Sequence, residues 1–134
     1  MSNSRTLFAI LLVACLGGSV AWAQTDSQEA NPGDWNGTWL ADGTLFSIAV
    51  TVTDNEFKVE ELQSLGFVWT AKLGNVHGNR ATIEVTYLGA TAIIIAELTG
   101  EGTAIAYADT CLPDFMVVCA LAKNRQAAFL RIEN

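Results

Sequence analysis

Residues 44–53 read Thr-Leu-Phe-Ser-Ile-Ala-Val-Thr-Val-Thr, and this stretch decides the fold. The larger apolar side chains recur at every second position, at Phe46, Ile48, Val50 and Val52. An alternation with period two is typical of a β-strand that turns one face toward the core. Residues 81–87 alternate in the same way, with Ala, Ile, Val and Tyr separated by Thr, Glu and Thr. The sequence therefore predicts sheet rather than helix.

Turn signals recur about once every dozen residues along the chain, close to the spacing expected of an all-β domain. They are Asp42-Gly43, Asp54-Asn55, Gln63-Ser64, Gly74-Asn75 through Gly78-Asn79, Gly89-Ala90, Gly100-Glu101-Gly102, Pro113-Asp114 and Lys123-Asn124. Gly and Asn tolerate the positive φ of tight hairpin turns, and strands joined by such short connections are antiparallel. Because closure removes the two exposed edges of a sheet, we expect an all-β single domain, an up-and-down antiparallel β-barrel of about eight strands.

The first 23 residues differ from the rest of the chain. Arg5 precedes an apolar run over residues 7–16, and Ala21-Trp22-Ala23 follows. A positive start, a short apolar core and an Ala-x-Ala end predict a signal peptide over residues 1–23 and a secreted or periplasmic protein. The apolar run is too short for a membrane span.

A second interpretation of this segment is a lipoprotein leader. Leu12-Val13-Ala14-Cys15 resembles a bacterial lipobox, in which Cys15 carries a lipid anchor and the protein is an outer-membrane lipoprotein. Beyond the leader, the polar composition of residues 24–34 predicts a flexible segment, and residues 35–134 form the predicted β-barrel domain.

The chain is acidic, with 14 Asp and Glu residues, 7 Lys and Arg residues and a net charge of −7. Without Arg5 of the leader, six basic residues remain against the 14 acidic ones, a net charge of −8. Phosphate backbones and anionic membrane surfaces repel such a chain. We therefore expect no nucleic-acid partner.

Two cysteines lie beyond the leader, Cys111 and Cys119, on either side of the Pro113-Asp114 turn. In an oxidising compartment such a pair predicts a disulfide that pins a hairpin. A metal site needs further ligands, and the single His of the chain, His77, lies in a segment rich in Gly and Asn. We therefore expect no metal and no cofactor.

The two ends of the predicted barrel carry a matching pair of residues. Gly37-Thr38-Trp39 opens the first strand and Arg131 lies in the last, so in a closed barrel Arg131 can lie over the face of Trp39. These residues, together with the size and the turn spacing, resemble the lipocalin and avidin group of barrels, the calycins. Those families begin with Gly-x-Trp and commonly carry an Arg that packs over the Trp. The resemblance implies structural roles for Trp39 and Arg131 and a general binding role, whereas avidin's polar biotin-binding residues have no counterpart here.

The size of the inward side chains decides whether such a barrel is solid or hollow. The aromatic residues predicted as ligand contacts are Phe46, Phe57, Trp69 and Tyr87. Ala104, Ala106 and Ala108 alternate along one strand, and inward-facing alanines would leave room for one small apolar or amphipathic ligand. A packed barrel without a cavity is the alternative.

Two segments break the alternation, because residues 93–95 and 116–118 are apolar on both faces. A strand with water on its outer side should alternate, so we expect these outer faces to be covered. Since no helix is predicted to cover them, the sequence predicts a homo-oligomer that packs through these strands.

Two acidic residues are candidates for catalysis. Glu97 follows Ile-Ile-Ile-Ala, and Asp109 follows Ala-Tyr-Ala, where burial would suit a carboxyl group to proton transfer; a solvated rim is the alternative. Three functions follow, in order of preference. The first is a ligand-binding barrel. The second is a protein-interaction or inhibitor module acting through the loops at residues 63–66, 74–79 and 112–115. The third is an isomerase or cyclase that uses Glu97 or Asp109 with Tyr87.

Overall fold

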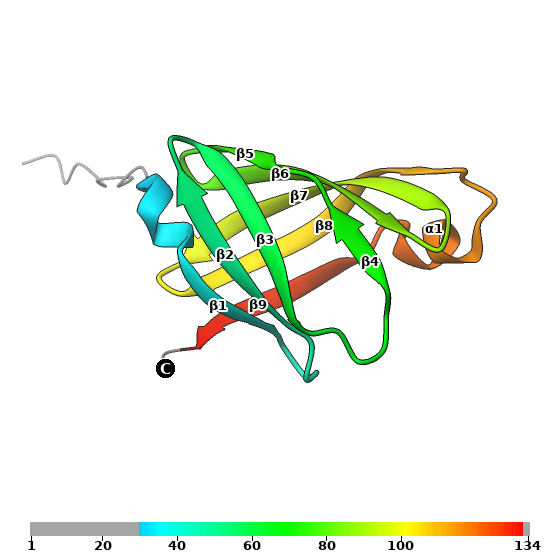
Figure 1. The fold of residues 1–134 in the computed structure, drawn as a ribbon, viewed down its shortest axis with the longest axis horizontal. Helices are drawn as coiled ribbons and strands as arrows, with labels where there is room; N and C mark the ends of the chain where they lie inside the picture. Colours follow the sequence, from blue (N-terminus) through cyan, green and yellow to red (C-terminus); the bar gives the residue numbers. More distant parts are fainter. Residues whose placement is uncertain (1–29, 133–134) are drawn as a thin grey trace, which may run out of the picture.

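The structure, a computed structural model, describes residues 30–132, which form an antiparallel all-β barrel (Figure 1). The strands are β1 (Gly37–Ala41), β2 (Ser47–Thr53), β3 (Glu56–Gln63), β4 (Trp69–Ala71), β5 (Gly74–His77), β6 (Arg80–Tyr87), β7 (Ala90–Gly100), β8 (Thr103–Leu112) and β9 (Gln126–Ile132). Two short helices accompany them, the 3-10 helix η1 (Pro32–Trp35) and the α-helix α1 (Val117–Ala122).

The sheet closes on itself. Successive strands pair around the wall, β6 pairs with β7, and β9 pairs back with β1. Both β4 and β5 lie beside β6, because β5 pairs with its first residues and β4 with its last. The wall therefore has eight strand positions, one of them divided. The predicted up-and-down barrel of about eight strands is confirmed.

The connections alternate between the two ends of the barrel. The β2–β3, β5–β6 and β7–β8 connections are two-residue turns at the end where η1 lies, which we call the closed end. The longer connections at residues 42–46, 64–68 and 113–125, together with the turn at residues 88–89, lie at the opposite end. Figure 1 shows α1 at this second end, which we call the loop end.

The β2–β3 turn illustrates why this sequence folds into hairpins. Asp54 and Asn55 both adopt left-handed backbone conformations, with φ of 48° and 66°. Positive φ at both central residues belongs to the turn type whose twist matches that of the flanking strands. The strands on either side place Val50 and Phe57 in the core.

Two tryptophans fill the closed end. Trp35 Nε1 donates a hydrogen bond to the carbonyl of Gly78 over 3.2 Å, and Trp39 Nε1 donates one to the carbonyl of Trp35 over 2.8 Å. Both side chains are buried. The helix η1 is therefore packed into the barrel, although sequence analysis places its first residues in the flexible segment.

The segment between β8 and β9 corrects the sequence analysis. The prediction of an apolar strand at residues 116–118 is wrong, because Met116 precedes α1 and the next two residues begin that helix. An apolar run of three residues carries no period that separates strand from helix. Cys119 is the buried residue of α1, and its bond to Cys111 holds the helix against the end of β8.

Candidate functional site

The barrel is hollow. A cavity of about 420 Å³ lies inside it, and all of its lining residues are aliphatic or aromatic. The lining extends from Trp35 and Trp39 at the closed end to Phe67 at the loop end. This volume lies within the range of about 300–1,000 Å³ that ligand pockets occupy. The inside of the barrel is therefore the candidate functional site.

The aromatic residues predicted as ligand contacts all line this cavity: Phe46, Phe57, Trp69 and Tyr87. The rings of Phe46 and Trp69 lie 6.0 Å apart between centroids, and Phe67 meets Tyr87 edge-on at 5.7 Å. Phe57 meets Trp35 edge-on at 5.4 Å, toward the closed end. Aromatic pairs thus bound the cavity near both ends, and contact with a ligand stays a prediction.

Small side chains create the empty volume. Ala104 and Ala106 on β8 line the cavity, and so does Ala96 on the neighbouring β7. Since these side chains end at Cβ, the wall leaves space that larger residues would fill to normal interior density. Ala108 is not among the lining residues, and the β7–β8 register shifts beside it.

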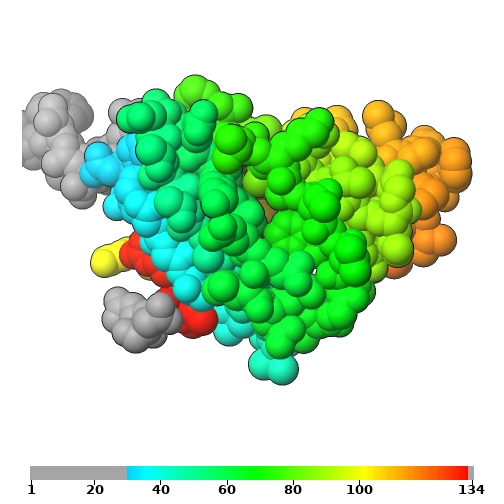
Figure 2. All heavy atoms as spheres, in the orientation of Figure 1, coloured from blue at the N-terminus to red at the C-terminus, as the bar shows by residue number. Residues whose placement is uncertain are grey.

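The wall of the barrel is incompletely paired beside β3. Phe57 of β3 pairs with Gly74 of β5, whereas residues 58–63 of β3 pair, among the described strands, with β2 alone. β4 in turn pairs with β6 alone. We call the interval between β3 and β4 the seam, and Figure 2 shows a small hollow among the atoms of this region. Because η1 covers the closed end, a ligand has to enter through the loop end or the seam.

Trp69 holds a buried donor without a partner. Its Nε1 is the one buried side-chain nitrogen or oxygen within residues 30–132 that makes no hydrogen bond. A buried donor without a partner costs about 1–3 kcal/mol. Trp69 lies opposite Tyr87 in the β4–β6 pairing, at the last residue of β6 and therefore near the loop end. A polar group that reached this nitrogen would recover the cost.

The two acidic candidates for catalysis do not line the cavity. Glu97 follows the lining residue Ala96 on β7, so its side chain points to the outer face and is 33% exposed. Its Oε1 accepts a hydrogen bond from the Tyr107 hydroxyl over 3.4 Å and lies 3.9 Å from Arg80 Nε. Asp109 is exposed on β8. This geometry gives no support to proton transfer inside the barrel.

Trp35 is the main cavity residue that sequence analysis misses. It follows a polar segment with an Asn-Pro-Gly turn, and that composition predicts a flexible lead-in rather than a core residue. The available signal was the spacing of four residues between Trp35 and Trp39, whose rings lie 6.2 Å apart. A second tryptophan so close to the first strand marks a buried aromatic pair.

The outer face of β7 is partly covered within one chain. Ile94 lines the cavity, so Ile93 and Ile95 point outward. Ile95 is nevertheless only 7% exposed, and its partners on the neighbouring strands are Thr82 and Tyr107. Side chains of the same chain thus cover part of the surface that sequence analysis assigns to a second subunit. The homo-oligomer stays a prediction, which sedimentation at micromolar protein concentration would test.

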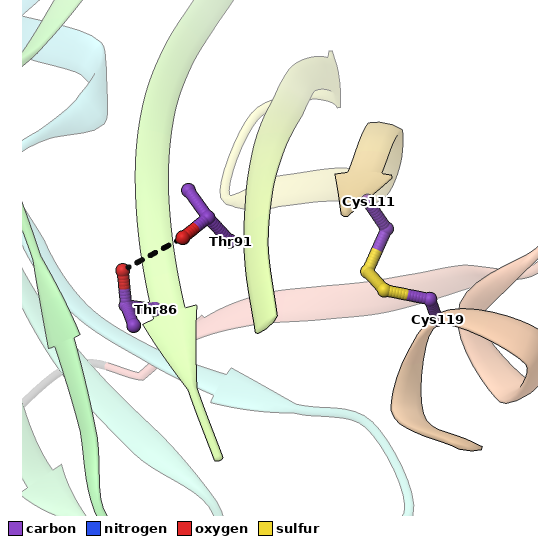
Figure 3. The surroundings of a disulfide bond; sticks show 4 residues. All are labelled: Thr86, Thr91, Cys111 and Cys119. Atoms are coloured by element: carbon purple, nitrogen blue, oxygen red, sulfur yellow. Dashed lines mark hydrogen bonds between the residues drawn. A yellow bond between two sulfur atoms is a disulfide. The ribbon is translucent and has the colours of Figure 1, made fainter. Parts of the chain in front are cut away.

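The predicted disulfide between Cys111 and Cys119 is confirmed. Figure 3 shows it joining the end of β8 to α1, near the β6–β7 hairpin, where the hydroxyls of Thr86 and Thr91 lie 3.4 Å apart. The bond therefore secures a helix at the loop end rather than a simple hairpin.

The predicted signal peptide over residues 1–23 and the alternative lipid anchor at Cys15 lie outside the described residues. Within residues 30–132, no helix has the length and apolar character needed to cross a membrane. The same part of the chain holds no group of three or more His, Cys, Asp or Glu residues arranged to bind a metal ion.

Comparison with known proteins adds no relative. No protein-family model, no curated protein and no solved structure matches the chain significantly. The closed antiparallel barrel is compatible with a calycin-like fold. The resemblance to lipocalins and avidins therefore depends on this architecture and on Gly37, Trp39 and Arg131.

Proposed function

We propose that the protein is a secreted or periplasmic barrel that binds one small apolar or amphipathic ligand inside its cavity. The observation that carries the proposal is the cavity of about 420 Å³ lined by aliphatic and aromatic residues. At roughly 30 Å³ for each water-sized group, this space holds about 14 non-hydrogen atoms. A medium-length acyl chain or a compound of terpenoid size has these dimensions.

The free energy of packing supports an occupied cavity. An empty apolar void destabilises a protein by about 24 cal/mol per Å³, so a dry cavity of this size would cost on the order of 10 kcal/mol relative to a packed core. That figure matches the whole stability of a small domain, about 5–15 kcal/mol. A ligand that fills the space restores the missing dispersion contacts.

The proposed location is supported by the disulfide. The bond between Cys111 and Cys119 joins two elements at the loop end, and disulfides form and persist in oxidising compartments. A leader over residues 1–23 would deliver the chain to such a compartment.

Native mass spectrometry of the protein purified from its own host tests the proposal. We expect a retained small molecule, released on denaturation, with a mass of about 14 non-hydrogen atoms. The ligand-free protein should then bind the neutral apolar probe N-phenyl-1-naphthylamine, with a rise in probe fluorescence. A protein that retains no molecule and does not bind the probe would contradict the proposal.

A further inference from the structure

Exposed apolar side chains gather at one end of the barrel. Of the 13 large apolar side chains that the structure exposes, eight lie in the four connections of the loop end. We call the six most exposed of them the apolar rim: Leu45, Val68, Leu88, Phe115, Val117 and Leu121. The turns of the closed end, at residues 54–55, 78–79 and 101–102, consist of Asp, Asn, Gly and Glu. The two ends of the molecule therefore differ in chemistry.

The apolar rim is continuous with the cavity. Phe67 is 50% exposed and also lines the cavity, and it meets Tyr87 edge-on. Phe46, another lining residue, directly follows the rim residue Leu45. An apolar molecule passing between the rim and the cavity would thus remain in contact with apolar side chains.

The short helix α1 presents part of the rim. Val117 and Leu121 are four residues apart, which places them on one face of the helix, and both are exposed. Cys119 lies on the buried side and ties the helix to β8. Figure 2 shows the orange atoms of this region at the end of the molecule farthest from the cyan η1.

The charges of the chain favour an uncharged occupant. The four connections of the loop end carry Asp42 and Asp114 against Lys123 and Arg125, a net charge of zero. The entire net charge of −7 therefore lies elsewhere in the chain. An anionic surface would repel the body of the protein, whereas a neutral one would not.

We propose that the apolar rim docks onto an electrically neutral lipid surface, from which the cavity takes up its ligand. This inference rests on the proposed function. The rim side chains come from four separate connections that ring the loop end, and fluid lipid can surround side chains that stand apart in this way. Apolar side chains of membrane-surface proteins enter the boundary between headgroups and acyl chains, and their affinity scales with buried apolar area.

Flotation of the purified protein with phosphatidylcholine vesicles tests the inference. We expect the protein to float with the vesicles, and Phe115→Ser and Leu121→Ser each to lower the partition coefficient roughly tenfold. The matched control is Leu130→Ser, which removes an exposed leucine from β9, outside the rim, and should leave partitioning unchanged. All forms share residues 1–29, so an anchor in that segment would contribute equally to each. Circular dichroism confirms that each variant is folded.

Binding of N-phenyl-1-naphthylamine without vesicles separates this inference from the proposed function. Phe115 and Leu121 do not line the cavity, so both variants should bind the probe as the wild type does. Probe binding without vesicle binding would overturn the docking inference alone. Rim-dependent vesicle binding without probe binding would overturn the proposed function alone.

Three further outcomes would also overturn the docking inference. Equal flotation of Phe115→Ser and wild type would show that the rim does not contact lipid. Stronger binding to phosphatidylglycerol vesicles than to phosphatidylcholine would contradict a neutral surface. A dimer in sedimentation that Phe115→Ser dissociates, without vesicle binding, would show that a second copy of the chain covers the rim.

Discussion

Arg131 lies over the indole ring of Trp39, directly across the β1–β9 pairing, with its Cζ 5.8 Å from the ring centroid. The same guanidinium donates a hydrogen bond to the carbonyl of Asp34 in η1 over 2.7 Å. The backbone nitrogen of Arg131 donates to the carbonyl of Gly102 in the β7–β8 turn. One residue thus joins the first strand, the last strand, a closed-end turn and the helix at that end.

Replacing Arg131 with Met should destabilise the barrel. The variant keeps an apolar chain of similar length but loses the cation–π contact and the hydrogen bond to η1, so we expect the free energy of unfolding to fall by about 2 kcal/mol. Arg131→Lys keeps the charge without the planar guanidinium and should lose less. Urea unfolding measures both variants. A Met variant within about 0.5 kcal/mol of wild type, the range of ordinary surface substitutions, would contradict this role.

The fold could be predicted from the sequence because its determinants are local. The alternation in residues 44–53 fixes which face of β2 is buried, and Asp54-Asn55 reverses the chain without outside help. Closure depends on a distant pair, but Trp39 and Arg131 mark it in the sequence because both ends of the chain carry unusual residues for a strand.

The cavity could be predicted only in part. The aromatic positions follow from period two, but the alanines of β8 alternate with Ile105 and Tyr107, so both faces of that strand are apolar and the sequence cannot orient it. The seam depends on backbone pairing that β3 and β4 do not make with each other. The helix α1 depends on the disulfide, whose geometry residue types alone do not determine.

Gly74 occupies a position where a side chain does not fit. A Cβ there would collide with the backbone carbonyl of Thr82 and lie 3.0 Å from the Cβ of Ile83. We expect Gly74→Ala to push β5 from β6 and to lower the free energy of unfolding by about 1–3 kcal/mol. Gly33→Ala is the matched control, since a Cβ there meets nothing within 4 Å. Equal unfolding midpoints for the two variants would show that β5 shifts without cost.

Removal of the disulfide should loosen the loop end and leave the barrel folded. The bond closes a short loop, with eight residues of separation between Cys111 and Cys119. Chain entropy then predicts a loss of about 2.5 kcal/mol for the Cys111→Ser, Cys119→Ser double variant. Thermal unfolding gives the loss, and far-ultraviolet circular dichroism should still report sheet. Reduced wild type serves as the control, and a collapse of the sheet signal would contradict the expectation that α1 alone depends on the bond.

Filling the cavity should exclude the ligand and stabilise the ligand-free protein. Ala106 lines the cavity, so the ring of Ala106→Phe would occupy part of the empty volume. We expect the affinity for N-phenyl-1-naphthylamine to fall at least tenfold, about 1.4 kcal/mol. Burial of the ring should raise the free energy of unfolding by about 1–2 kcal/mol. The matched control is Ala128→Phe on β9, because Ala128 does not line the cavity and should accept the ring on the outer face without loss of binding. If the folded Ala106→Phe variant bound the probe as tightly as Ala128→Phe, the ligand would have to bind outside the barrel.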